Sequence, residues 1–129
     1  MKINNWYEKY FGSFLFLKNK DTVVFNEKLI FNKEEPYLDG VKLSVDKNYL
    51  IPSIGTGLVL FIGEKENYGN TVIVSVNTGV NIWYCNISPN VKLYDYIKDG
   101  ELVGSSLDNY IYLVFKKDGN ILNYEEYIH

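Results

Sequence analysis

The sequence predicts an all-β domain, an antiparallel β-sandwich or barrel-like fold preceded by a short N-terminal helix or arm. Segments rich in valine, isoleucine and aromatic residues recur every roughly 8–12 residues, with glycine, asparagine and aspartate turns between them. The chain has no alanine, the best helix former, whereas β-branched and aromatic residues are plentiful. Its 129 residues are the length of one domain, and no linker or low-complexity stretch divides them.

The N-terminal part is the one region with helical character. Asn5 can cap a helix over residues 4–17, because four aromatic residues there fall roughly on one face. We therefore expect an aromatic arm or short helix in residues 1–20 and the β domain in residues 21–129.

The β domain is expected to begin with short strands. Residues 22–25 and 28–31 are brief apolar runs, and Pro36 and Asp39-Gly40 then mark turns. Alternation from 41 to 45 predicts a further strand. The later expected strands are residues 57–63, 71–76, 80–87, 91–97, 101–104, 110–115 and 121–122, separated by turns at 67–70, 77–79, 98–100 and 117–120.

Composition excludes several classes of function. The chain has a single histidine, His129, and a single cysteine, Cys85. These two residues cannot make a His/Cys zinc cluster, a Ser-His-Asp triad inside the fold or an intrachain disulfide. Thirteen scattered lysines, no arginine and a net charge of −3 argue against nucleic-acid binding.

The chain as given is expected to be soluble. Its longest apolar runs, at residues 58–62 and 110–115, are far shorter than the roughly 20 residues that span a bilayer. Twelve tyrosines, seven phenylalanines and two tryptophans exceed what the core of a small domain needs. Because tyrosine is favoured at interfaces, this surplus is consistent with a binding surface.

From about Tyr37 to Ile128 the sequence resembles the LytM/lysostaphin-type peptidase domain, a family of zinc endopeptidases that act on peptidoglycan cross-links. The resemblance implies an antiparallel, barrel-like fold built on a duplicated hybrid motif. Tyr94 departs from the pattern, because the family has a glycine at this position. The likeness lies in ordered pieces, GTGLV at 55–59, YGNTVIV at 68–74, WYCNI at 83–87, VKLYDYIKDGELVG at 91–104, and YIYL at 110–113 followed by KDG at 117–119.

The resemblance also implies that each catalytic position of the family has been replaced. Leu38 stands where a ligand histidine is expected, and Lys42 where a ligand aspartate is expected. Asn86 stands at the position of a catalytic histidine. Tyr110 and Tyr112 replace the two histidines of the H-x-H motif, one a zinc ligand and the other the general base. A lysine opposes a divalent cation and a leucine offers no lone pair, so we expect no zinc, no other cofactor and no enzymatic activity.

Within the family, residues 63–66, 83–86 and 94–100 look most like a sporulation branch, the stage IV sporulation protein FA type. That likeness implies a location on the extracytoplasmic side of a membrane, between mother cell and forespore. It also implies an anchor outside this chain and protein partners that include an intramembrane protease. Such a domain would hold and regulate the protease, which processes a sigma-factor precursor.

Three functions remain open from the sequence. The first is a non-catalytic interaction domain whose groove binds protein partners through Leu38, Lys42, Tyr84, Asn86, Tyr110 and Tyr112. The second is a peptidoglycan- or glycan-binding module that keeps the substrate groove and stacks aromatic rings on sugars. The third is a residual peptidoglycan endopeptidase with a non-standard metal. Cys85, which alternation places with Trp83 on one face of a strand, is expected to be a buried, inert thiol.

Overall fold

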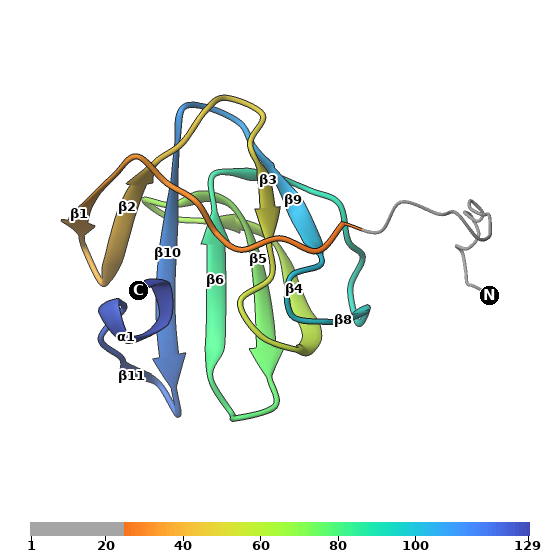
Figure 1. Cartoon of the computed structure of the whole chain (residues 1–129). Helices are drawn as coiled ribbons and strands as arrows, with labels where there is room; N and C mark the ends of the chain where they lie inside the picture. Colours follow the sequence, from red (N-terminus) through yellow and green to blue (C-terminus); the bar gives the residue numbers. More distant parts are fainter. Residues whose placement is uncertain (1–24) are drawn as a thin grey trace.

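A computed structural model describes residues 25–129 of the chain, and the arm expected at residues 1–20 lies outside them. Within the described residues, no helix is long and apolar enough to cross a membrane. Figure 1 shows a fold made almost entirely of strands, with one short helix near the C-terminus. The predicted all-β antiparallel class is confirmed.

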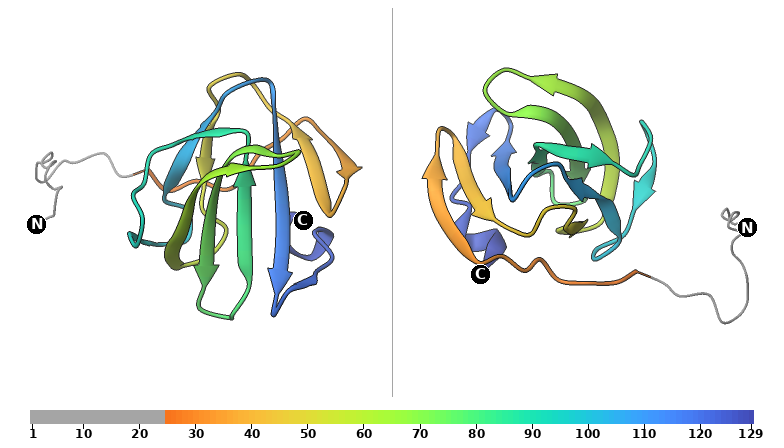
Figure 2. Two further views of the ribbon diagram at one scale, coloured as in Figure 1. Left: turned by 180° about the vertical axis from the view of Figure 1, so that it is seen from behind. Right: turned by 90° about the horizontal axis from the view of Figure 1, so that it is seen from above.

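Two antiparallel sheets make up the domain. The large sheet has the order β1-β2-β10-β6-β5-β4-β8 with β11 paired to β10, and the small sheet has the order β3-β9-β7. Seen from above, the strands curve round a common interior (Figure 2). The strands are β1 Lys33–Tyr37, β2 Gly40–Ser44, β3 Leu50–Pro52, β4 Gly57–Lys65, β5 Gly69–Val76, β6 Asn81–Cys85, β7 Ile87–Pro89, β8 Tyr96–Ile97, β9 Leu102–Ser106, β10 Tyr110–Lys117 and β11 Asn120–Ile121, and the helix is α1 Glu125–Ile128.

Alternation along the strands builds the main core between the two sheets. On β10, Ile111, Leu113 and Phe115 point inward and are fully buried. Ile51 and Val103 of the small sheet face them across the interior. Burying a side chain of this size stabilises the fold by about 1.5–3 kcal/mol, so the apolar alternation is the main source of stability.

The close approach of β2 to β10 depends on Gly40. A Cβ atom at this position would collide with the backbone carbonyl of Leu113. Any side chain here would push β2 away from β10. Gly40 therefore allows Lys42 and Tyr112, two residues further along, to stand side by side on the paired strands.

The structure corrects several expected elements. Residues 28–31 are not a strand but an extended segment, whose Leu29 and Phe31 side chains pack against the core. The Ile30 N–H donates to the Tyr49 hydroxyl at 2.7 Å instead of to a neighbouring strand. Conversely, Lys33–Tyr37 is a strand despite Pro36 and three charged residues, because it is an edge strand paired only to β2.

The other corrections concern strand length and the C-terminus. Residues 91–97 contain a strand only at Tyr96–Ile97, and residues 80–87 are divided into β6 and β7 at Asn86. Helix α1 was not expected from the sequence. It brings His129 against the first strand, where its Nε2 atom lies 2.7 Å from Glu34 Oε1.

Candidate functional site

The face of the large sheet that points away from the main core carries three of the residues that the sequence singled out, Lys42, Tyr110 and Tyr112. Strand pairing sets Tyr112 opposite Lys42 of β2 on one side and opposite Cys85 of β6 on the other. Tyr110, two residues earlier on β10, points to the same side as Tyr112. Lys42, Tyr110 and Tyr112 thus lie together, as the prediction of a common groove requires.

Aromatic rings cover this face. The Tyr37 and Tyr112 rings stack with centroids 4.1 Å apart and an interplanar angle of 15°. Tyr68 packs edge-on against both of these rings and against Trp83, at centroid distances of 5.7–6.0 Å. The Tyr110 ring lies 5.4 Å from that of Tyr112. We call this surface the aromatic face, defined by Tyr37, Phe61, Tyr68, Trp83, Tyr110 and Tyr112.

Three lysines lie over these rings. Lys42 Nζ is 4.6 Å from the Tyr110 centroid. Lys65 Nζ is 4.4 Å from the Phe61 centroid and 5.1 Å from that of Trp83, and Lys116 Nζ is 4.5 Å from that of Trp83. An ammonium group at this distance from a ring is attracted by the negative charge of the π-face. The aromatic face is therefore apolar at its base and positively charged above it.

Hydrogen bonds join the two hairpins that border the aromatic face. The Tyr37 hydroxyl donates to the Asn67 carbonyl at 2.7 Å, which links β1 to the β4–β5 turn. The Asp39 N–H donates to the Tyr68 hydroxyl at 3.1 Å, which links the β1–β2 turn to the β4–β5 turn. These bonds hold the rings in position, so the face is preorganised.

The buried surroundings of the rings keep the tyrosines neutral. Burial raises the pKa of Tyr112, and its contacts with the Tyr37 and Tyr110 hydroxyls raise it further. Burial is also the main cause of the raised pKa of Tyr68. At neutral pH these hydroxyls are therefore protonated donors, and none is a phenolate that could bind a metal.

Leu38 lies at the border of the site and not in it. It is the first residue of the two-residue turn between β1 and β2, with a φ of +48°. Its side chain is 64% exposed. Leu38 is therefore an apolar group at the tip of the hairpin, next in sequence to Tyr37.

Asn86 is held beside Tyr110 by its side chain. Asn86 Nδ2 donates to the Tyr110 carbonyl and to Asp108 Oδ2, both at 3.2 Å. Its φ of +65° is outside the strand conformation, so the inward and outward alternation of the β6 side chains ends at this residue. Asn86 thus positions the start of β10, and its side-chain amide is already hydrogen-bonded within the domain.

Tyr84 does not line the groove, contrary to the interpretation from the sequence. Its side chain is fully buried in the main core, on the face of β6 opposite to Trp83. The Tyr84 hydroxyl accepts a hydrogen bond from the Ile54 N–H at 2.8 Å. Burial raises the pKa of Tyr84 to about 12. Alternation along β6 already separates Tyr84 from Trp83, so this error was avoidable.

Cys85 shares the buried side of the aromatic face with Tyr68 and Val114. It is a free cysteine and fully buried. Burial raises the pKa of its thiol to about 12, against a smaller opposing effect of the Thr71 hydroxyl. The expected buried thiol is confirmed, and its surroundings disfavour the reactive thiolate.

Sequence reasoning missed Tyr37, Tyr68, Lys65 and Lys116 as members of this surface. Tyr37 is the last residue of β1 and Tyr68 lies in the β4–β5 turn, and the meeting of these two segments over the sheet is a tertiary event. The lysines could have been found only from the order of the sheet, in which β10 is paired directly to β6 and β4 lies beyond β5 on the other side.

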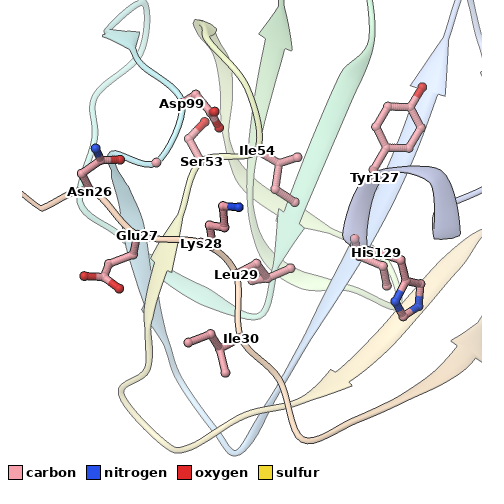
Figure 3. Close-up of a pocket in the computed structure, with 12 residues that line it drawn as sticks. Asn26, Glu27, Lys28, Leu29, Ile30, Ser53, Ile54, Asp99, Tyr127 and His129 are labelled. Atoms are coloured by element: carbon pink, nitrogen blue, oxygen red, sulfur yellow. The ribbon is translucent and has the colours of Figure 1, made fainter.

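Two pockets border the described part of the domain. One, of about 460 Å³, adjoins the aromatic face and includes Lys42, Glu35 and Tyr110 in its lining. The other, of about 720 Å³, lies between residues 26–30, the β3–β4 loop and the C-terminal helix (Figure 3). Figure 3 shows Leu29, Ile54 and Tyr127 around this second pocket, on the core side of the large sheet.

The side chains at the aromatic face do not suit a zinc ion. Leu38 has no donor atom, the Lys42 ammonium lies on the Tyr110 ring, and the neutral Tyr112 ring is stacked on Tyr37. Among residues 25–129, no group of three or more His, Cys, Asp or Glu side chains is arranged to hold a metal ion. Zinc in proteins takes thiolate, imidazole or carboxylate ligands, so this donor set does not fit it.

Several solved structures share this fold. Csd3 of Helicobacter pylori is 25% identical, with a TM-score of 0.63 over 70% of this chain and 26% of its own. Lysostaphin of Staphylococcus simulans is 22% identical, with a TM-score of 0.64 over 74% of this chain and 48% of its own. This chain therefore spans less than half of each of these two proteins.

A structure titled the SpoIIQ–SpoIIIAH pore-forming complex is also similar, at 20% identity and a TM-score of 0.62 over 77% of this chain and 70% of the other. No curated protein sequence matches the chain significantly. The profile of peptidase family M23 matches residues 37–127, which is well over half of the sequence. The chain therefore belongs to peptidase family M23.

Proposed function

We propose that this chain is a non-catalytic member of family M23 that binds protein partners through its aromatic face. The observation that carries the proposal is the pairing of Lys42 with Tyr112 on β2 and β10. By the family resemblance, Lys42 stands at the position of a ligand aspartate, and Tyr112 at one of the two histidines of the H-x-H motif, of which one is a zinc ligand and the other the general base. Here they hold an ammonium group and a neutral phenol.

Loss of the ligands removes the chemistry of the peptidase. A zinc peptidase hydrolyses its substrate with a water molecule that the metal ion activates. Tyr110 and Tyr112 stand at the aligned positions of the zinc-ligand and general-base histidines, and Asn86 at that of a further catalytic histidine. Asn86 is engaged with Asp108 and the Tyr110 backbone, and an amide group is no general base at neutral pH.

The proposed partners follow from the resemblance to the stage IV sporulation protein FA type. In this proposal the domain lies on the extracytoplasmic side of a membrane, between mother cell and forespore. There it holds and regulates a membrane-embedded metalloprotease that processes a sigma-factor precursor. The SpoIIQ–SpoIIIAH complex supports the general idea, because in that assembly a domain of similar fold is part of a protein complex.

Glycan binding is the weaker alternative. Sugars bind proteins by laying their apolar faces on exposed aromatic rings. On this surface Tyr37 and Tyr112 cover one another, and lysine ammonium groups lie over Tyr110 and Trp83. Titration with muropeptides, followed by the NMR signal of the Trp83 indole, would show a saturable shift only if this alternative were correct.

Metal content tests the non-catalytic part of the proposal. We expect elemental analysis of the purified chain to find far less than one zinc ion per molecule. A triple variant, Leu38→His, Lys42→Asp and Tyr112→His, restores the donor types and serves as the positive control for the assigned positions. Stoichiometric zinc in the unmodified chain would contradict the proposal.

Partner capture tests the binding part. The full-length protein, co-expressed with the intramembrane metalloprotease of the same genome, is expected to co-purify with it. Tyr110→Ala with Tyr112→Ala should abolish that capture, because it removes two rings of the aromatic face. Tyr94→Ala with Tyr96→Ala is the matched control, since these exposed tyrosines lie on β8 and the loop before it. Unchanged capture by the Tyr110/Tyr112 variant would rule out this face.

A further inference from the structure

We infer that the aromatic face receives an acidic segment of its protein partner, a stretch of chain whose carboxylates bind the lysines around Trp83. This inference rests on the proposed function of the same surface. It adds the chemical class of the partner, which neither the family nor the fold specifies.

The first step is the concentration of positive charge on one ring. Lys65 of β4 and Lys116 of β10 approach Trp83 from strands on either side, and both ammonium groups lie within 5.1 Å of its centroid. Two ammonium groups around one ring concentrate positive charge at Trp83, and charge acts more strongly where water is partly excluded. A carboxylate that approaches either ammonium group from the solvent side would offset this charge.

The second step is the lack of an internal counter-ion. Within residues 25–129 the structure contains one ion pair, between His129 and Glu34, and neither lysine takes part in it. Glu35 is registered opposite Lys42 in the pair β1–β2. Lys65 and Lys116 are thus outside the ion pairs of the described residues, although the chain as a whole carries −3.

The third step concerns the form of the ligand. The lysines lie over the rings, so a partner meets ammonium groups first and ring edges second. The Tyr112 hydroxyl, which burial keeps protonated, adds a neutral donor at the neighbouring end of the face, beside the Tyr110 ring. A surface of donors with few acceptors is complementary to carboxylates, and charge-assisted hydrogen bonds to them are the strong ones.

A direct binding experiment tests this inference. The probe is an acetylated, amidated hexaglutamate peptide, titrated into the full chain carrying Trp6→Phe, so that Trp83 is the single tryptophan. We expect saturable binding by calorimetry, accompanied by a change in Trp83 fluorescence. Lys65→Gln with Lys116→Gln should weaken binding by about tenfold or more, since it removes two charge-assisted contacts.

Matched controls separate specific from general charge effects. Lys92→Gln with Lys98→Gln changes the net charge equally on the loop around β8 and should alter the dissociation constant by less than about twofold. Glutamine removes the charge and keeps a polar side chain only one atom shorter than that of lysine, and circular dichroism checks that both double variants fold. A hexaglutamine peptide should not bind.

Several results would overturn the inference. These are no saturable binding of hexaglutamate, an equal loss in the two double variants, or tighter binding of tripolyphosphate, which would indicate a phosphate-bearing ligand. The proposed function fails separately, because it depends on partner capture by Tyr110 and Tyr112. If capture is lost in the Tyr110/Tyr112 variant while hexaglutamate does not bind, the interaction role stands and the acidic partner is wrong.

Discussion

At the scale of single residues, Leu38 and Tyr94 stand out among the residues in left-handed backbone conformations, because the others besides glycine are asparagine or aspartate. Leu38 has a φ of +48° and Tyr94 a φ of +70°. For an L-residue other than glycine, the left-handed region costs about 1–2 kcal/mol because Cβ crowds the carbonyl oxygen. At position 94 the family pattern has the glycine that the geometry requires, so the departure noted in the sequence has a measurable energetic consequence.

Tyr94→Gly is expected to stabilise the domain by about 0.5–1 kcal/mol, since relief of strain exceeds the entropy that glycine loses on folding. The side chain is 69% exposed, so little packing is lost. The control is Tyr96→Gly, an equally exposed tyrosine in β8, which should destabilise by about 1 kcal/mol. Urea unfolding measures both, and a similar loss in the two variants would show that Tyr94 is unstrained.

At the scale of the elements, the break between β6 and β7 decides which residues reach the aromatic face. Asn86 leaves the strand conformation, while its N–H still donates to the Asn70 carbonyl at 2.8 Å and its carbonyl accepts from the Leu107 N–H at 3.2 Å. The chain can therefore pass from the large sheet to the small one without losing backbone hydrogen bonds. Ile87 then enters the core from β7.

Substitutions at Asn86 should separate backbone from side-chain effects. Asn86→Gly keeps the left-handed conformation accessible and loses only the bonds to Asp108 and Tyr110, an expected loss of about 1 kcal/mol. Asn86→Ala loses these bonds and also strains the backbone, so we expect a loss of about 2 kcal/mol. The free energy of unfolding in urea distinguishes the two, and an equal loss would mean that the conformation itself carries no strain.

At the scale of the whole molecule, the large sheet separates two environments that bury ionisable groups. Tyr84 lies in the main core and Cys85 on the opposite side of the same strand. Both have a folded pKa of about 12, compared with ordinary values of 10 for the phenol and 9 for the thiol. Each group must therefore remain protonated while the domain is folded.

The free energy of unfolding should fall as the pH rises from about 9 to 12. In this range the unfolded chain releases protons that the folded chain keeps. The stabilisation is therefore fully present below pH 9 and is lost as the pH rises. The free energy of unfolding falls by at most about 1.4 kcal/mol per pH unit for each group. Urea unfolding between pH 8 and 11 measures this slope. In Cys85→Ala the free energy of unfolding should depend less on pH between pH 9 and 10, because the thiol that titrates first in the unfolded chain is gone. A free energy of unfolding that does not change with pH would contradict the prediction.

The sequence by itself determined the fold class, because β-branched alternation, glycine turns and the lack of alanine all favour antiparallel strands. It also determined the donor types of the site, since no fold can make a zinc ligand of Leu38 or Lys42. Alternation along β6 separated Tyr84 from Trp83, but only the packing of the small sheet showed which of the two faces is the main core. Tertiary structure alone likewise decided three further features: the pairing of β1 with β2, the packing of residues 28–31 against the core, and the position of the lysines over Trp83. Each depends on contacts between segments far apart in the chain, which local propensity does not contain.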